Sequence, residues 1–127
     1  MELRLGFFPD FKSADSVLLS GSPNAMGIFV EQLGAFVTSP RTEMPIHDLA
    51  LVSSAHPAQL FAVRSSSSAL GGFRWLCSDA EFETIRDKLQ ALAGCTAGHQ
   101  YFEFVSSDCQ LVVSVGEYDD AWWGQYG

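Results

Sequence analysis

Two stretches of the chain carry apolar residues at helical spacing. The first set is Met26, Phe29, Val30, Leu33, Phe36 and Val37, within residues 22–37, and the second is Phe82, Ile85, Leu89 and Leu92, within residues 78–93. Recurrence at three and four residues places each set on one face of a helix. Ser22 before Pro23 is typical of a helix start, and Ser78 with Glu81 has capping-box spacing. We therefore predict two amphipathic helices.

Short apolar runs surround both predicted helices. They lie near residues 2–8, 16–20, 46–52, 59–64, 73–77, 99–105 and 110–116. Runs of this length, separated by Gly, Pro and Ser, are typical of strands. Together with the helices they predict an α+β fold, a mostly antiparallel sheet of about seven strands with both helices on one face.

The same order of elements occurs twice along the chain. When residues 20–37 are placed above 76–93, Ser22 aligns with Ser78, Phe29 with Ile85 and Leu33 with Leu89; downstream, VSS at 52–54 matches VSS at 105–107. A fixed internal period is typical of duplication. We predict two strand–helix–strand–strand repeats related by a pseudo-two-fold axis.

The chain of 127 residues has the length of one domain. We therefore expect a single domain over 1–127, with repeats at about 16–64 and 73–116. The tail, residues 117–127, continues beyond the duplicated unit. A short Ser- and Gly-rich linker at 65–72 joins the two repeats.

The net charge of −8 indicates which kinds of molecule the protein can bind. A nucleic-acid binder needs cations to displace phosphate counterions, and an anionic membrane surface also attracts cations, so we expect neither partner. After Lys88 the chain has no Lys or Arg, while it carries Glu103, Asp108, Glu117, Asp119 and Asp120. This charge favours a basic protein partner; the alternative is that acidity only keeps the protein in solution.

The compartment is predicted from apolar runs and cysteines. No apolar run reaches the roughly 18 residues of a membrane span, and MELRLGFF lacks the basic region and cleavage site of a signal peptide. Three widely spaced cysteines without a CxxC pair indicate a reducing environment. We expect a cytoplasmic protein.

The tail, GEYDDAWWGQYG, combines aromatic and acidic residues. Tyr and Trp dominate the energy of many interfaces, and carboxylates add charge pairing. The predicted partner-binding residues are Glu117, Tyr118, Asp119, Asp120, Trp122, Trp123 and Tyr126. The alternative is that the tryptophans fold back over the sheet, with Asp119 and Asp120 in the turn. Because adjacent side chains of an extended segment point to opposite sides, one tryptophan can be buried while the other is exposed.

The first predicted helix has small residues and a single charge, Glu31, on its outer surface. Gly27, Ile28, Glu31 and Gly34 form a candidate oligomer face, which would give a homodimer. Interior glycines cost a helix about 1 kcal/mol each, so they need a reason. One reason is a subunit or partner interface, and the other is that the helix is sandwiched within its own fold.

Candidate catalytic groups are few and scattered. Cys77 ends an apolar strand and is typical of a buried thiol, while Cys95 and Cys109 lie outside any protease signature. His47 and His99 are near-equivalent in the repeat and could meet across its axis, but a zinc site needs three or four donors. We expect no metal, no cofactor and no enzymatic activity.

The stretch VLLSGSPNAMGIFVEQLGAFV, followed by a histidine and two more strands, resembles small bacterial immunity proteins of polymorphic and contact-dependent toxin systems. The resemblance covers mainly residues 17–63. It implies a cytoplasmic α/β protein that inhibits a basic toxin, such as a nuclease, by masking its active site. A self-associating structural or regulatory subunit of a bacterial complex is the alternative function.

Overall fold

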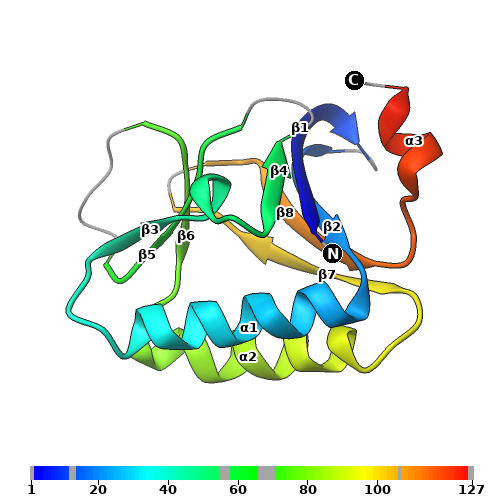
Figure 1. Cartoon of the computed structure of the whole chain (residues 1–127). Coiled ribbons are helices and arrows are strands. Elements are labelled where there is room, and N and C mark those ends of the chain that lie inside the picture. Colours follow the sequence, from blue (N-terminus) through cyan, green and yellow to red (C-terminus); the bar gives the residue numbers. More distant parts are fainter. Residues whose placement is uncertain (1, 12–13, 55–57, 66–70, 106, 126–127) are drawn as a thin grey trace.

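The computed structural model describes residues 2–11, 14–54, 58–65, 71–105 and 107–125 and has an α+β architecture (Figure 1). In chain order the elements are β1 (Leu3–Phe11), β2 (Ala14–Gly21), α1 (Pro23–Val37), β3 (Glu43–Pro45), the 3-10 turn η1 (Ile46–Asp48), β4 (Val52–Ser54), β5 (Leu60–Val63), β6 (Phe73–Leu76), α2 (Asp79–Ala93), β7 (Gly98–Glu103), β8 (Gln110–Val115) and α3 (Asp120–Gly124). Within these ranges, no helix is long and apolar enough to cross a membrane.

The strands form two mixed sheets, so the prediction of one mostly antiparallel sheet is wrong. The order is β4-β1-β2-β8-β7 in the larger sheet and β3-β5-β6 in the smaller one. Antiparallel pairs join β1 to β2, β7 to β8 and β3 to β5, whereas β1–β4, β2–β8 and β5–β6 are parallel. Apolar alternation identifies a strand but carries no information about its neighbour, which is why the pairing was mispredicted.

The two halves of the chain make corresponding strand pairs. In each half, the last strand pairs antiparallel with a strand that follows the long helix: β5 with β3, and β8 with β7. The strand before each helix pairs in parallel with the last strand of the other half: β2 with β8, and β6 with β5. A duplicated ancestor would produce this arrangement, and the internal duplication stays a prediction.

Both long helices lie on one face of the larger sheet, side by side (Figure 1). Their starts are those predicted. The Ser22 side chain accepts a hydrogen bond from the Ala25 N–H at 3.1 Å, with Pro23 in the first turn. The Ser78 side chain accepts one from the Glu81 N–H at 3.4 Å. These side chains satisfy backbone donors that a helix start leaves unpaired.

The main core fills the space between the helices and both sheets. The Phe29 ring of α1 stacks on Trp75 of β6 at 6.4 Å, and Trp75 contacts Phe102 of β7 at 5.0 Å. Leu3, Leu5, Leu19 and Leu111 contribute the sheet side and are fully buried. The alternate side chains of the same strands point to the opposite face of the sheet.

The small residues of α1 pack against α2. A Cβ atom added at Gly27 would lie 4.0 Å from the Ala93 Cβ, and one at Gly34 would lie 3.5 Å from the Phe82 ring. Gly27 and Gly34 therefore face side chains of α2 in the same chain, while the oligomer face stays a prediction. Ile28 and Glu31 are exposed.

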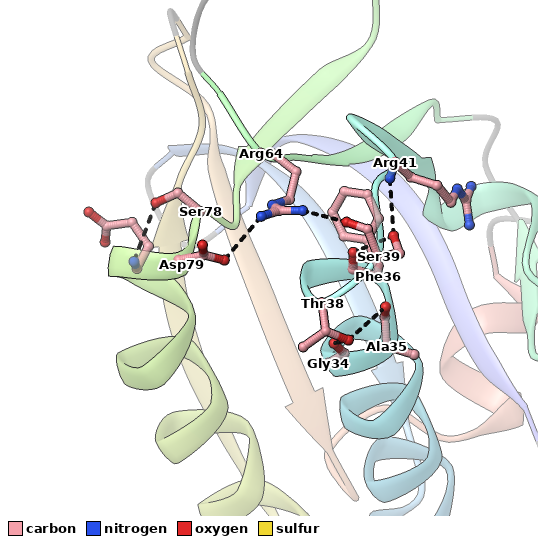
Figure 2. Close-up of polar contacts among 10 residues, drawn as sticks. Gly34, Ala35, Phe36, Thr38, Ser39, Arg41, Arg64, Ser78 and Asp79 are labelled. Carbon is pink, nitrogen blue, oxygen red and sulfur yellow. Dashed lines mark hydrogen bonds and ion pairs between the residues drawn. The ribbon is translucent and has the colours of Figure 1, made fainter.

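Arg64 joins the adjacent ends of the two helices, as Figure 2 shows. Its Nη1 donates to the Ser39 carbonyl, just after α1, at 2.8 Å, and its Nη2 donates to the Asp79 carboxylate, at the start of α2, at 3.1 Å. A cation suits the C-terminal end of one helix dipole, and a carboxylate suits the N-terminal end of the other. This contact ties β5, which precedes Arg64, to both helices.

The strand predicted near residues 46–52 is wrong over most of that range. The chain forms β3, then η1, and resumes an extended path at β4. The backbone is held here by a side chain, because the Leu60 N–H donates to Nδ1 of His47 at 3.1 Å. Such a contact between distant residues cannot be read from local alternation.

Candidate functional site

An aromatic cluster covers the face of the larger sheet that is turned away from α1 and α2. Figure 1 places α3 on that side. Phe8 of β1 contacts Trp122 at 5.3 Å and Trp123 at 5.7 Å between ring centroids. Trp122 also contacts Tyr118 at 4.6 Å, and Tyr118 contacts Phe11 at 5.8 Å. The C-terminal tail is thereby folded onto the sheet.

The inner part of this cluster is a small second core. Trp123, 2% exposed, packs with Phe8, Leu18 and Val112. Gly6 leaves the space that the indole occupies, since a Cβ there would lie 3.1 Å from Trp123 Cζ3. Apolar side chains on a sheet face need cover from water, and Trp123 supplies it.

The outer part of the cluster reaches solvent. Phe11, Tyr118 and Trp122 are partly buried, and exposed carboxylates lie near them in sequence. Asp15 belongs with them because its carboxylate accepts a hydrogen bond from the Asp10 N–H at 3.0 Å. We call this surface the tail patch; it consists of Phe11, Tyr118 and Trp122 with the acids Asp10, Asp15, Asp119 and Asp120. Lys12, the neighbour of Phe11 in sequence, lies outside the described residues.

The acids at the start of α3 also have structural contacts. The Asp119 carboxylate accepts a hydrogen bond from the Trp122 N–H at 2.9 Å and so caps the helix. The Asp120 carboxylate pairs with the Arg4 guanidinium at 2.6 Å, although its side chain is 93% exposed. These carboxylates fix the position of the tail and still face solvent.

Glu117 lies at the other end of the tail segment. It accepts a hydrogen bond from the Ser114 hydroxyl at 2.6 Å and lies 3.0 Å from Nδ1 of His99. Ser114 is fully buried, so Glu117 satisfies a polar group on the covered sheet. Glu117 therefore contributes to the structure as well as to the negative charge of this surface.

The tail residues that were predicted to bind a partner differ in their exposure to solvent. It brings Tyr118, Asp119, Asp120 and Trp122 together on one surface, with Glu117 next in sequence to Tyr118. Trp123 is buried and offers no contact area. Tyr126 lies outside the described residues.

The sequence-based prediction missed Phe8 and Phe11. A signal was present for Phe8, which alternates with Leu3, Leu5 and Phe7 and so lies on the opposite face of the strand. Strict alternation gives no such signal for Phe11, because the strand register shifts between Phe8 and Phe11. A large apolar residue on that face requires a covering segment. The tail, with its two adjacent tryptophans, was the segment available in the sequence.

Among the described cysteines and histidines, none belongs to the tail patch, although His99 is bound to Glu117, the residue before Tyr118. Burial raises the pKa of the Cys77 thiol well above its ordinary value, with a smaller contribution from the Glu81 charge. His47 is bound to the backbone of Leu60, and His99 to Glu117. In the described part of the chain, no group of three or more His, Cys, Asp or Glu side chains is arranged to hold a metal ion.

Compared with known proteins, the chain matches no family model, no curated protein and no solved structure. A functional conclusion therefore rests on the chain's own residues and on the tail patch.

Proposed function

We propose that this chain is a non-enzymatic, acidic, cytoplasmic binding protein, and specifically an immunity protein that inhibits a basic toxin by masking its active site. The tail patch is the observation that carries this proposal. It presents the partly buried rings of Phe11, Tyr118 and Trp122 together with four exposed carboxylates. Aromatic anchors within a charged rim are typical of energetically dominant interface positions.

The anchors are held rigidly before a partner arrives. Trp122 contacts Phe8, Phe11, Tyr118 and Trp123, and its own N–H is bound by Asp119. A side chain that is already ordered loses little conformational entropy on binding. The buried Trp123 beneath it supports the surface and does not make the contact.

The charge of the chain supports a basic partner. Its net charge is −8, and its last cation in sequence is Lys88. Opposite charge accelerates encounter and excludes acidic competitors. A toxin that acts on nucleic acid needs a cationic groove for phosphates, and the carboxylates of the tail patch are complementary to such a groove.

The test uses the purified product of the neighbouring gene. Calorimetry measures its affinity for this chain, and an activity assay measures its neutralisation. The variant Asp119→Asn/Asp120→Asn removes two charges, and Asn remains a good helix cap. The variant Trp122→Ala removes the central anchor. Each should weaken binding by about tenfold or more, equivalent to at least about 1.4 kcal/mol.

A matched control removes two charges elsewhere. Glu83 and Asp87 are exposed on α2, which lies on the other side of the sheet from the tail patch. Glu83→Gln/Asp87→Asn should leave affinity and neutralisation unchanged. If the neighbouring product is not toxic, or if both tail variants protect as well as the native chain, the proposal is wrong.

A further inference from the structure

Among the residues that the structure describes, strand β7 is an edge of the larger sheet. It is last in the strand order and pairs with β8 along one side. The pairing runs without a register shift from Gly98 opposite Val115 to Glu103 opposite Gln110. Edge strands expose backbone donors and acceptors that can pair with another chain.

The direction of the β7 backbone groups follows from its neighbour. The Gly116 N–H donates to the Gly21 carbonyl, at the end of β2, at 3.2 Å. Backbone N–H and C=O groups alternate between the two sides of a strand. Since the Gly116 N–H faces β2, the N–H and C=O groups of Leu111, Val113 and Val115 face β7. The residues opposite them on β7 are Phe102, Gln100 and Gly98.

The remaining backbone groups of β7, those of His99, Tyr101 and Glu103, therefore point away from the sheet. A second contact agrees with this alternation: the Val105 N–H, two residues further on, donates away from β8 to the Arg74 carbonyl of β6 at 2.8 Å. That bond closes the edge beyond Glu103. The open window is thus 99–103, with Tyr101 at its centre.

A groove gives access to this window. Its volume is about 590 Å³, and it lies between β7, β6 and α2. Trp75, Ile85 and Phe102 supply apolar side chains, and Glu81 and Lys88 supply charged ones. Tyr101, which also lines it, is 44% exposed, an unusual exposure for an aromatic residue of this fold.

The other described edges are short or blocked. β4 has three residues, β3 ends at Pro45, and β6 is joined to the chain after β7 through Arg74 and Val105. Short strands, prolines and covering segments are common protections of sheet edges. β7 has six residues and contains no Pro, Lys or bulge.

We propose that two copies of this chain associate by antiparallel pairing of their β7 edges, with Tyr101 on the two-fold axis. The β7 edge contains none of the residues of the tail patch, although His99 contacts Glu117, and the inference does not depend on the proposed function. In this register His99 of one copy is opposite Glu103 of the other, and all outward groups of the window find partners. If the pairing register shifted by two residues, His99 of one copy would lie opposite Val105 of the other. The Val105 N–H is already bound to the Arg74 carbonyl of its own chain, so that register would lose a hydrogen bond.

The side chains favour a second copy as the occupant. His99, Tyr101 and Glu103 project from the same face of β7, and cross-strand neighbours on one face interact directly. In this register, His99 of each copy lies opposite Glu103 of the other copy. The two Glu103 side chains are therefore not cross-strand neighbours. His99 contacts Glu117 through Nδ1, which leaves its Nε2 for Glu103 of the second copy.

The first experiment combines sedimentation with amide hydrogen exchange over a range of concentrations. We expect a monomer–dimer equilibrium. Amides of His99, Tyr101 and Glu103 should gain protection as the dimer forms, while those of Gln100 and Phe102 should be protected at every concentration by β8. A protein that stays monomeric at millimolar concentration overturns the inference. The same holds if the β7 amides become protected only when a basic partner protein is added.

Two variants locate the contact. Tyr101→Pro removes an outward N–H, the position at which an edge strand tolerates proline. Glu103→Lys places a cation opposite His99 and leaves the backbone unchanged. Each should raise the dimer dissociation constant by about tenfold or more. The matched control Glu83→Lys makes the same charge change on the exposed surface of α2 and should have no effect; near-ultraviolet circular dichroism checks folding. A dimer that withstands Glu103→Lys and folded Tyr101→Pro refutes β7 pairing.

Discussion

The Arg4 guanidinium of β1 lies 2.6 Å from the Asp120 carboxylate in the first turn of α3. This ion pair joins the beginning of the described chain to its end, across the face of the sheet that the tail covers. The Asp120 side chain is 93% exposed, so the pair positions the tail without contributing much energy. The burial of Trp123 and the cap at Asp119 are the stronger contributions.

The cap at Asp119 should therefore matter more than the ion pair. Asp119→Ala removes the acceptor for the Trp122 N–H and should cost about 1 kcal/mol, within the range of about 0.5–2 for helix caps. Asp119→Asn should retain most of the stability, because Asn caps well, and Asp120→Asn should cost at most about 1 kcal/mol. Urea unfolding followed by tryptophan fluorescence measures all three. An Asp120→Asn variant less stable than Asp119→Ala would contradict this ranking.

The two adjacent tryptophans should respond very differently to truncation. Trp123→Ala empties the second core between Phe8, Leu18 and Val112 and should cost about 3–5 kcal/mol. Trp122→Ala removes a ring that is only partly buried and should cost about 1–2 kcal/mol, since less buried apolar area is lost. Chemical denaturation quantifies the difference, and near-ultraviolet circular dichroism shows whether the aromatic cluster persists. Equal losses for the two variants would contradict the assignment of Trp123 to the core.

Gly27 should tolerate alanine with a gain in stability. A Cβ atom there would lie 4.0 Å from the Ala93 Cβ, an ordinary van der Waals contact. Alanine also restricts the unfolded chain and has the higher helix propensity, so Gly27→Ala should stabilise by about 0.5–1 kcal/mol. The matched control Ala35→Gly, at an exposed position of α1, should lose a similar amount. Thermal unfolding measures both, and a destabilised Gly27→Ala would show that α1 and α2 lie closer together.

The helices could be predicted from the sequence because their signals are local. The apolar stripe from Met26 to Val37 and the caps at Ser22 and Ser78 lie within the segments they define. The sheet order could not be predicted, since β2 pairs with β8, which is remote in sequence. The repeated order of elements in the sequence indicates which segments are helices and strands, but not how the strands pair. It therefore predicted neither the two mixed sheets nor the short η1 turn.

The candidate site was predicted in part for the same reason. The sequence argument assumed an extended tail, which is wrong because Trp122 and Trp123 lie in helix α3. One tryptophan is nevertheless buried, and it is Trp123. Trp123 is buried because it fills the space above Gly6 and contacts the ring of Phe8, and both of these residues are on β1. That contact spans most of the chain, and no local pattern around residues 117–127 contains it.

Cys77 should make the stability of the protein depend on alkaline pH. Burial in the main core raises the pKa of its thiol above the ordinary value of 9.0, and the nearby Glu81 charge raises it further. The native state therefore holds the thiol proton at a pH where the unfolded state releases it. Stability from this group is complete below pH 9.0 and falls as the pH rises beyond that value, by about 1.4 kcal/mol per pH unit.

The measurement compares the native chain with Cys77→Ala by urea unfolding on both sides of pH 9.0. Tyrosines and lysines also titrate in this range, but they are common to both proteins, so the difference between the two slopes isolates Cys77. Alkylation of the folded protein gives a second readout: the exposed Cys95 should react first, then the half-buried Cys109, while Cys77 reacts after unfolding. Parallel pH profiles, or rapid labelling of Cys77 in the folded state, would show that the thiol is not held in the core.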